Sequence, residues 1–160
     1  MKRIVICCCF VWMLFQSVAI AHNMPEEEMA IGGVGYGCTL GYVKSIYGEP
    51  QEKKWIRNGE LKYIYSSSFV VIGWRYYPYD QEEDNMAVGG VILSDNSLAT
   101  PSGFTVGMPY QSVVNAFGEG IDYNKNGVYH YHPKRKRAYS FCFKVNGQGL
   151  ITEISIQSNL

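Results

Sequence analysis

Two histidines on one short segment are the side chains of this chain best suited to metal chemistry. His130 and His132 are separated by a single residue, so an extended strand places both imidazoles on the same face. Imidazole nitrogen is a common zinc ligand, and the pair is therefore half of a possible metal site. No third ligand is evident nearby, because the remaining histidine, His22, lies near the N-terminus. We expect two ordinary surface histidines, no bound metal and no cofactor.

Cys142 is the candidate nucleophile nearest to these histidines. A thiol acts as a nucleophile when a base is oriented toward it, and nothing in the sequence orients either imidazole in that way. A cysteine in an alternating strand more often packs as a small apolar side chain. The glycines from Gly32 to Gly37 do not indicate a phosphate-binding loop, because Gly37 is not followed directly by Lys-Ser or Lys-Thr. The sequence therefore predicts no catalytic residue and a protein that is not an enzyme.

A run of four basic residues is the first candidate surface for a partner. It follows Pro133 and could bind phosphate, an acidic lipid headgroup or an acidic patch of another protein. The alternative is a solvated hairpin tip, whose charges prevent the sheet from pairing edge to edge with another sheet. Under either interpretation, contact with a membrane would be peripheral at most. The four residues are Lys134, Arg135, Lys136 and Arg137.

Aromatic side chains give a second candidate surface. The chain has 3 Trp and 13 Tyr, too many for the core of one small domain to bury entirely, so some should line an exposed sheet face. Tyr and Trp are favoured anchors in protein interfaces, although cross-strand pairing that only stabilises the sheet is the alternative. The aromatic set comprises Trp55, Tyr63, Tyr65, Trp74, Tyr76, Tyr77, Tyr79, Tyr129 and Tyr131. The predicted partner-binding residues among them are Trp74, Tyr76, Tyr77 and Tyr79.

The elements that must position these residues occur twice in the chain. Six positions of segment 33–49 recur at the same spacing in segment 103–119, seventy residues later. A fixed offset of this kind indicates a duplicated supersecondary unit, whose copies stack to bury their apolar faces. The positions are Gly33, Gly37, Val43, Tyr47, Gly48 and Glu49 in the first copy and Gly103, Gly107, Val113, Phe117, Gly118 and Glu119 in the second.

Each copy begins with a short helix and continues with strands. Thr39 is a suitable N-cap for the first helix, and Gly48 followed by Pro50 ends it. The second helix is predicted from Met108 to Phe117. After each helix the apolar period changes from near four to two, which indicates strands. The predicted strands lie at about 55–57, 61–65, 69–77, 86–93, 128–132, 139–145 and 150–157.

The fold class that follows is α+β. Two tandem repeats, each a helix plus antiparallel strands, should form one sheet of about six to eight strands with the helices on one face. Alternation assigns Phe141 and Phe143 to the face that the helices cover, and Cys142 to the opposite face. The predicted divisions are a signal peptide at 1–21, a flexible leader at 22–30, repeat unit 1 at 31–94, a linker at 95–102 and repeat unit 2 at 103–160.

The N-terminus carries the features of a secretory signal. Positive charge at Lys2 and Arg3 precedes an apolar run, and Ala19-Ile20-Ala21 supplies the small residues of a signal-peptidase site. An uncleaved membrane anchor is the alternative. Cleavage after Ala21 removes two of the 14 basic residues and none of the 14 acidic ones. The remaining chain is then nearly neutral, so nucleic acid is not an expected partner.

The residues around both helices resemble a known family. The glycine-rich segment 33–39, the helix that ends in Ile46-Tyr47-Gly48-Glu49-Pro50, and the aromatic strands after it are similar to the small exported repeats of the BamE (SmpA/OmlA) group and of the β-lactamase-inhibitor proteins. The resemblance covers both halves and implies a non-enzymatic module that presents a sheet to another protein. The chain differs from these groups because it has no lipobox and no paired cysteines within each unit.

These observations predict an exported, non-enzymatic binding or envelope-assembly module, periplasmic or extracellular. It would present an aromatic sheet face and charged loops to a protein partner. Two alternatives stay open. A secreted enzyme of unknown class requires a deep pocket with convergent polar groups, whereas a structural periplasmic protein would have no specific partner.

Overall fold

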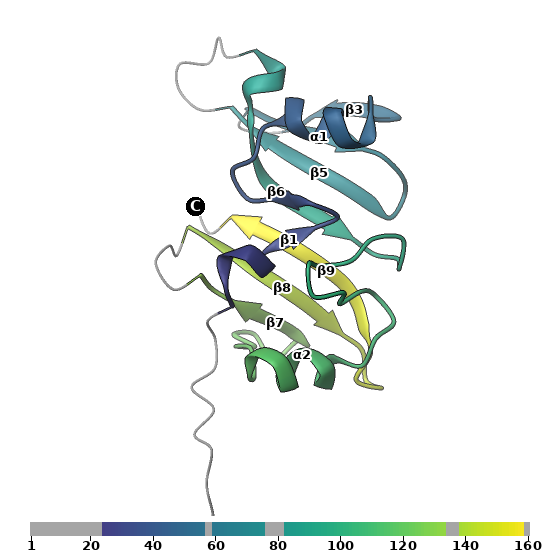
Figure 1. The fold of residues 1–160 in the computed structure, drawn as a ribbon, viewed down its shortest axis with the longest axis vertical. Helices are drawn as coiled ribbons and strands as arrows, with labels where there is room; N and C mark the ends of the chain where they lie inside the picture. The colour runs from purple at the N-terminus through teal and green to yellow at the C-terminus, as the bar shows by residue number, and fades with distance from the viewer. Residues whose placement is uncertain (1–23, 57–58, 76–81, 134–137, 159–160) are drawn as a thin grey trace, which may run out of the picture.

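In the part of the chain that the structure describes, seven antiparallel strands form a main sheet and two more form a small sheet. The computed structural model describes residues 24–56, 59–75, 82–133 and 138–158. With two α-helices, these strands confirm the α+β class (Figure 1). In spatial order the main sheet consists of β3 (Glu52–Trp55), β4 (Glu60–Ile64), β5 (Phe69–Trp74), β6 (Ala87–Leu93), β9 (Ile151–Ser158), β8 (Tyr139–Val145) and β7 (Val128–Tyr131).

The two helices are α1 (Leu40–Tyr47) and α2 (Tyr110–Phe117). α1 begins as predicted, because the Thr39 hydroxyl oxygen accepts a hydrogen bond of 3.1 Å from the backbone N–H of Tyr42. α2 begins two residues later than predicted, because the Met108 carbonyl accepts a 2.9 Å hydrogen bond from Ile151 of β9 and is held outside the helix. Neither of these eight-residue helices has the length or the apolar character to cross a membrane.

Both helices pack on the same face of the main sheet, as the sequence predicts. α1 places Leu40 against Gly73 of β5, where a side chain would collide with it. α2 places Tyr110 against Tyr129 of β7, with the ring centroids 4.3 Å apart. Figure 1 shows the two helices at opposite ends of the sheet. The row of buried side chains that crosses this face consists of Tyr63, Val71, Val91, Ile156, Phe141 and Tyr131.

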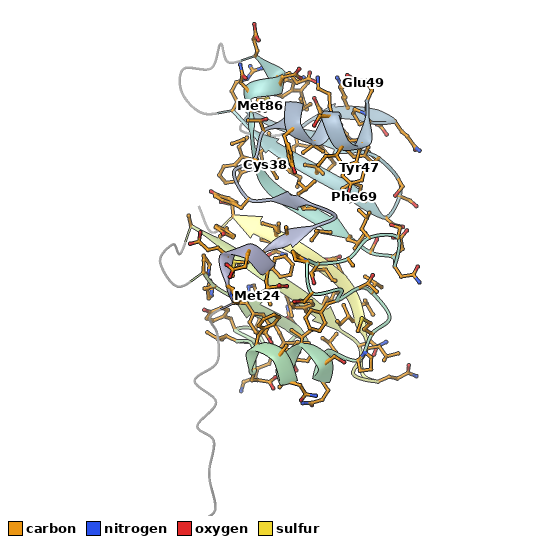
Figure 2. All side chains as sticks on the ribbon, viewed as in Figure 1. Met24, Cys38, Tyr47, Glu49, Phe69 and Met86 are labelled. Carbon is orange, nitrogen blue, oxygen red and sulfur yellow. The ribbon has the colours of Figure 1, made fainter. Side chains whose placement is uncertain are left out.

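The described residues from Met24 onward do not form the flexible leader that the sequence predicts. Met24 and Met29 are 1% and 2% exposed and belong to the core. Met24 is labelled in Figure 2. Between them lies the 3-10 helix η1 (Glu26–Glu28), and the Glu28 carboxylate accepts hydrogen bonds from the backbone N–H and the hydroxyl of Ser102. The three adjacent glutamates suggest a solvent-exposed segment. Burial of the two methionines nevertheless holds it against the fold.

The small sheet links the two halves of the molecule. β1 (Ala30–Ile31) pairs with β2 (Val34–Gly35) and lies across the middle of the main sheet, where β1 contacts β9 and β2 contacts β6 (Figure 1). Beside it, the Tyr47 ring packs against that of Phe69 (Figure 2), with centroids 5.0 Å apart. The Tyr47 hydroxyl donates a hydrogen bond to the carbonyl of Gly32. The core therefore continues from one half to the other.

The chain enters both helices through the same kind of contact. The backbone N–H of Gly37 donates to the carbonyl of Val88 in β6 at 2.8 Å, and that of Gly107 donates to the carbonyl of Ile151 in β9 at 2.8 Å. Each contact fixes the start of a helix to a strand of its own half. The described fold thus consists of α1 with β3 to β6, followed by α2 with β7 to β9.

An acidic turn fastens α1 to the sheet. The 3-10 helix η3 (Glu83–Asn85) lies in the loop before β6 and packs against α1. The Glu83 carboxylate accepts hydrogen bonds from Lys53 of β3, at 2.7 Å, and from the hydroxyl of Tyr63 in β4. The acidic side chain of Glu83 in this turn is therefore engaged inside the fold.

Candidate binding site

The face of the main sheet opposite the helices, called the open face below, has two parts. Across β4, β5 and β6 it carries partly exposed side chains such as Lys62, Ile72 and Ile92. Across β7 and β8 it carries His130 and Cys142, which face each other in register. The first part is accessible, whereas the second is covered by its own side chains.

Trp74 is the last residue of β5 and lies on the accessible part. A Cβ atom added to Gly89 of β6 would lie 2.8 Å from three atoms of the indole five-membered ring, Cγ, Cδ1 and Nε1. Equal distances to three ring atoms mean that the indole lies flat over Gly89. One face of the ring is therefore packed on backbone, and the opposite face is directed away from the sheet.

A β-bulge makes room for this ring. Ile72 pairs with Gly90 and Gly73 pairs with Val88, so Gly89 is the extra residue between the two pairs. Glycine inside a strand costs roughly 0.5–1 kcal/mol relative to alanine. It often marks a point where a ligand or another backbone approaches closely. The successive glycines Gly89 and Gly90 thus place a side-chain-free strip at the centre of the sheet.

Both glycines line a hollow of about 250 Å³, called the Trp74 hollow below. Gly90 forms its floor, because the indole lies over Gly89. Trp74, Ile72 and Ile92 supply its apolar walls. The hollow is somewhat smaller than typical small-molecule pockets, which measure about 300–1,000 Å³. Its size and lining therefore suit one side chain or a group of similar size.

Polar groups stand on two opposite rims of the Trp74 hollow. Glu60 of β4 lines the hollow and is the register partner of Trp74, so the two side chains are neighbours on the same face of the sheet. Gln157 and Ser158 of β9 form the other rim, where Gln157 is the register partner of Gly90. Two strands, β5 and β6, separate these rims. The polar groups therefore border an apolar floor and do not converge on one point.

The covered part of the open face holds a connected group of polar side chains. The Cys142 sulfur lies 3.3 Å from Nδ1 of His130, and the Ser140 hydroxyl lies 3.4 Å from Nδ1 of His132. The Tyr123 hydroxyl lies 2.9 Å from Nε2 of His132, and its ring meets His130 edge to face. Two predictions are thus confirmed: the two histidines share one face, and Cys142 lies on the face opposite the helices.

The pair formed by Cys142 and His130 is a neutral one. Cys142 is 1% exposed, and burial, assisted by the charge of Glu153, raises the pKa of its thiol to about 12. Burial, assisted by His132, lowers the pKa of His130. At neutral pH the thiol keeps its proton, whereas nucleophilic cysteines react as thiolates. Among the described residues, no three His, Cys, Asp or Glu side chains are grouped so that they could hold a metal ion.

Of the predicted partner-binding residues, only Trp74 falls within the described part of the chain. The other aromatic strand residues that are described lie on the side of the helices. Tyr63 and Tyr131 are buried there, and their hydroxyls donate to Glu83 and to the carbonyl of Gly118. Among the described residues, the expected aromatic open face is therefore reduced to Trp74 and Tyr123. The residues outside the described part are Tyr76, Tyr77, Tyr79, Lys134, Arg135, Lys136 and Arg137.

Sequence reasoning missed the residues that make the hollow. The sequence places Gly89 and Gly90 in a strand but gives them no functional role. It also does not include Glu60 in any candidate site. The available signal was the pair of glycines inside an apolar strand, a position where glycine is unfavourable without a special reason. The partner of those glycines, Trp74, could not be inferred, because the bulge that brings them together is a property of strand register.

No protein-family model and no curated protein matches this chain. Two solved structures share its fold. A cysteine-rich secretory protein from Staphylococcus aureus has a TM-score of 0.58 and 10% identity over 87% of this chain and 49% of that one. An extracellular protein containing an SCP domain from Bacillus anthracis has a TM-score of 0.52 and 9% identity over 78% of this chain and 44% of that one. The chain thus spans less than half the length of either protein.

These neighbours contradict the resemblance to the BamE and β-lactamase-inhibitor-protein repeats, which was wrong. The residues that carried the resemblance have a general structural role. Gly37 and Gly107, before the helices, have φ of 81° and 92°, and Gly48 and Gly118, after them, have φ of 75° and 80°. Glycine adopts positive φ at low cost, so unrelated chains that enter and leave a short helix in this way acquire the same glycines.

Proposed function

We propose that this protein is an exported, non-catalytic binding module that takes a protein partner on its open face at the Trp74 hollow. The observation that carries the proposal is the indole of Trp74, which is held over Gly89 with one face directed outward beside an apolar floor. A large aromatic side chain held rigidly at an accessible hollow loses little conformational entropy on binding, and Trp is enriched among residues that dominate interface energies.

Export is supported by the features of the N-terminal segment, in which a basic start, an apolar run and Ala19-Ile20-Ala21 occur in order. The two structural neighbours are themselves described as secretory and extracellular proteins, which agrees with this part of the proposal. We also infer that the halves 31–94 and 103–160 are tandem repeats. The equivalent hydrogen bonds of Gly37 and Gly107 before the two helices support that inference.

The chemistry of the open face supports a non-catalytic role. Cys142 and His130 form an enclosed pair without a thiolate. At the Trp74 hollow, Glu60 and Gln157 stand on opposite rims, two strands apart. A catalytic site requires acid, base or nucleophile groups that meet at a common reacting atom. The open face offers an anchor for binding instead.

The proposal is tested with the mature chain immobilised and exposed to an envelope or culture-medium fraction of the producing cell. A bound protein is identified, purified and measured against variants by calorimetry. Trp74→Ala should weaken its binding at least about tenfold, as expected for an interface anchor. Trp55→Ala is the matched control, because Trp55 is 51% exposed but lies on edge strand β3 outside the hollow. Equal binding by both variants and the parent would contradict the proposal.

A further inference from the structure

We propose that the Trp74 hollow receives a basic side chain, lysine or arginine, from the protein partner. The inference rests on the proposed function and names the chemistry that the site recognises. The cationic head would lie between the outer face of the Trp74 indole and the carboxylate of Glu60. The methylene stem would lie beside the ring on Gly90, because the indole already covers Gly89.

The electrostatics of the hollow favour a cation. The face of an aromatic ring carries partial negative charge, and a cation over Trp gains about 0.5–1 kcal/mol when exposed and more when desolvated. Glu60 adds a full negative charge beside the same ring, because it is the register partner of Trp74. Lys62, two residues along β4, does not line the hollow. An acidic side chain would be repelled at this rim.

Among the described residues, the carboxylate of Glu60 has no hydrogen-bond or ion-pair partner, so none of them competes with a cation from a partner protein. The carboxylate of Glu83 on the other side of the sheet differs, because Lys53 and Tyr63 both donate to it. The chain also contains the proposed type of contact elsewhere, since the guanidinium carbon of Arg75 lies 4.6 Å from the ring centroid of Trp55.

The shape of the hollow suits the stem of a long basic side chain. Lysine and arginine lay their methylene groups along apolar surface while the charged head stays near water or a counter-charge. Ile72, the register partner of Gly90 on β5, and Ile92, two residues along β6, give such a surface beside Gly90. A purely aliphatic side chain would fill the same space but would leave the acidic rim without a partner.

Gly90 offers a variant that closes the hollow without disturbing the fold. A Cβ added there would meet its nearest atoms, in Ile156 and Ile72, at 3.4 Å, an ordinary van der Waals contact. Its φ is not in the positive range, so alanine fits the backbone. Gly90→Ala should therefore fold normally and occupy the floor on which the stem would lie. Gly89→Ala would instead displace Trp74.

The experiment follows the indole N–H signal of Trp74 by NMR in mature protein carrying Trp55→Phe, in which Trp74 is the sole tryptophan. The probes are blocked tripeptides of alanine with a central lysine, arginine, norleucine or glutamate. Lysine and arginine peptides should shift the signal in a saturable way below about 20 mM. The norleucine peptide, which keeps the four-carbon stem of lysine but has no ammonium group, should bind at least about threefold more weakly. Gly90→Ala should abolish binding of the lysine peptide.

Glu60→Gln is the decisive variant. It should lower the affinity for the lysine peptide about threefold to tenfold and leave the affinity for the norleucine peptide unchanged. Equal binding of lysine and norleucine, no effect of Glu60→Gln, or no shift by any peptide would overturn the inference. A shift caused by a chitin oligosaccharide but not by lysine would also overturn it and indicate a glycan. If Trp74→Ala abolishes binding of the purified partner but Glu60→Gln does not, the proposed function stands. Only the inference that the hollow receives a basic side chain is then wrong.

Discussion

The indole ring of Trp74 lies flat on the backbone of Gly89, across a β-bulge that joins strands β5 and β6. On the opposite face of the same sheet, Leu40 of α1 occupies the space that Gly73 leaves free. Two glycines at one bulge therefore admit a large side chain on each face. One contact anchors a helix, and the other holds an aromatic ring at the surface.

This relationship predicts opposite outcomes for two neighbouring substitutions. Gly89→Ala places a methyl group 2.8 Å from three ring atoms of Trp74, and overpacking of this kind typically costs about 1–3 kcal/mol. Gly90→Ala meets only ordinary contacts and should change the free energy of unfolding by less than about 1 kcal/mol. Urea denaturation measures both values. Equal destabilisation by the two variants would show that Trp74 is not seated on Gly89.

The acidic turn predicts a loss of stability at low pH. Burial would raise the pKa of Glu83, but hydrogen bonds from Lys53 and Tyr63 outweigh it and hold the pKa below its ordinary value. Because the folded pKa lies below the unfolded value of about 4.3, the stabilisation is present above about pH 4.3. It is lost as the pH falls through the folded pKa.

Thermal unfolding of the parent and of Glu83→Gln, measured between about pH 6 and pH 3, tests this expectation. The glutamine variant should be less stable at pH 6 and should lose less stability on acidification, because it has no carboxylate to protonate. Parallel curves for the two proteins would exclude Glu83 as a source of the acid sensitivity.

A buried pair of tyrosines predicts how much stability the fold loses when one hydroxyl group is removed. The Tyr110 hydroxyl lies 2.9 Å from that of Tyr131 and accepts a hydrogen bond of 3.1 Å from the buried backbone N–H of Gly120. Tyr110→Phe leaves that N–H without its acceptor, which should cost about 1–3 kcal/mol. Tyr123→Phe is the control, because Tyr123 is 58% exposed. This variant should change the free energy of unfolding by no more than about 0.5 kcal/mol. Chemical denaturation distinguishes the two; similar values would contradict the assignment.

The two thiols of the mature chain should react at different rates. Both cysteines are free, Cys38 is partly exposed, and Cys142 is buried. Burial raises the pKa of both thiols, that of Cys142 to about 12. A thiol reagent such as Ellman's reagent at pH 8 should therefore modify Cys38 in the folded protein and Cys142 only after unfolding. Cys38→Ser isolates the second reaction, and rapid labelling of Cys142 in that folded variant would refute its enclosure.

Much of the local structure follows from the sequence because it depends on neighbouring residues. Thr39 caps α1 through an N–H three residues away, and alternation along β8 places Phe141 and Cys142 on opposite faces. Such features need no knowledge of the rest of the chain. The position of Met24, by contrast, depends on a long-range contact, since its backbone N–H donates to the carbonyl of His132. The flanking glutamates concealed its burial.

The local pattern of residues was sufficient to predict the two short helices, the antiparallel strands and the face that each strand turns toward the helices. Which of the open-face residues form a site depends on how the strands assemble. The contact of Trp74 with Gly89 and the placement of Glu60 beside the indole both result from the register of three strands and from one bulge. Register is set by the packing of the whole sheet, because a shift of one residue would turn every side chain of a strand to the other face. For that reason the hollow is a property of the assembled sheet, although every residue that lines it is visible in the sequence.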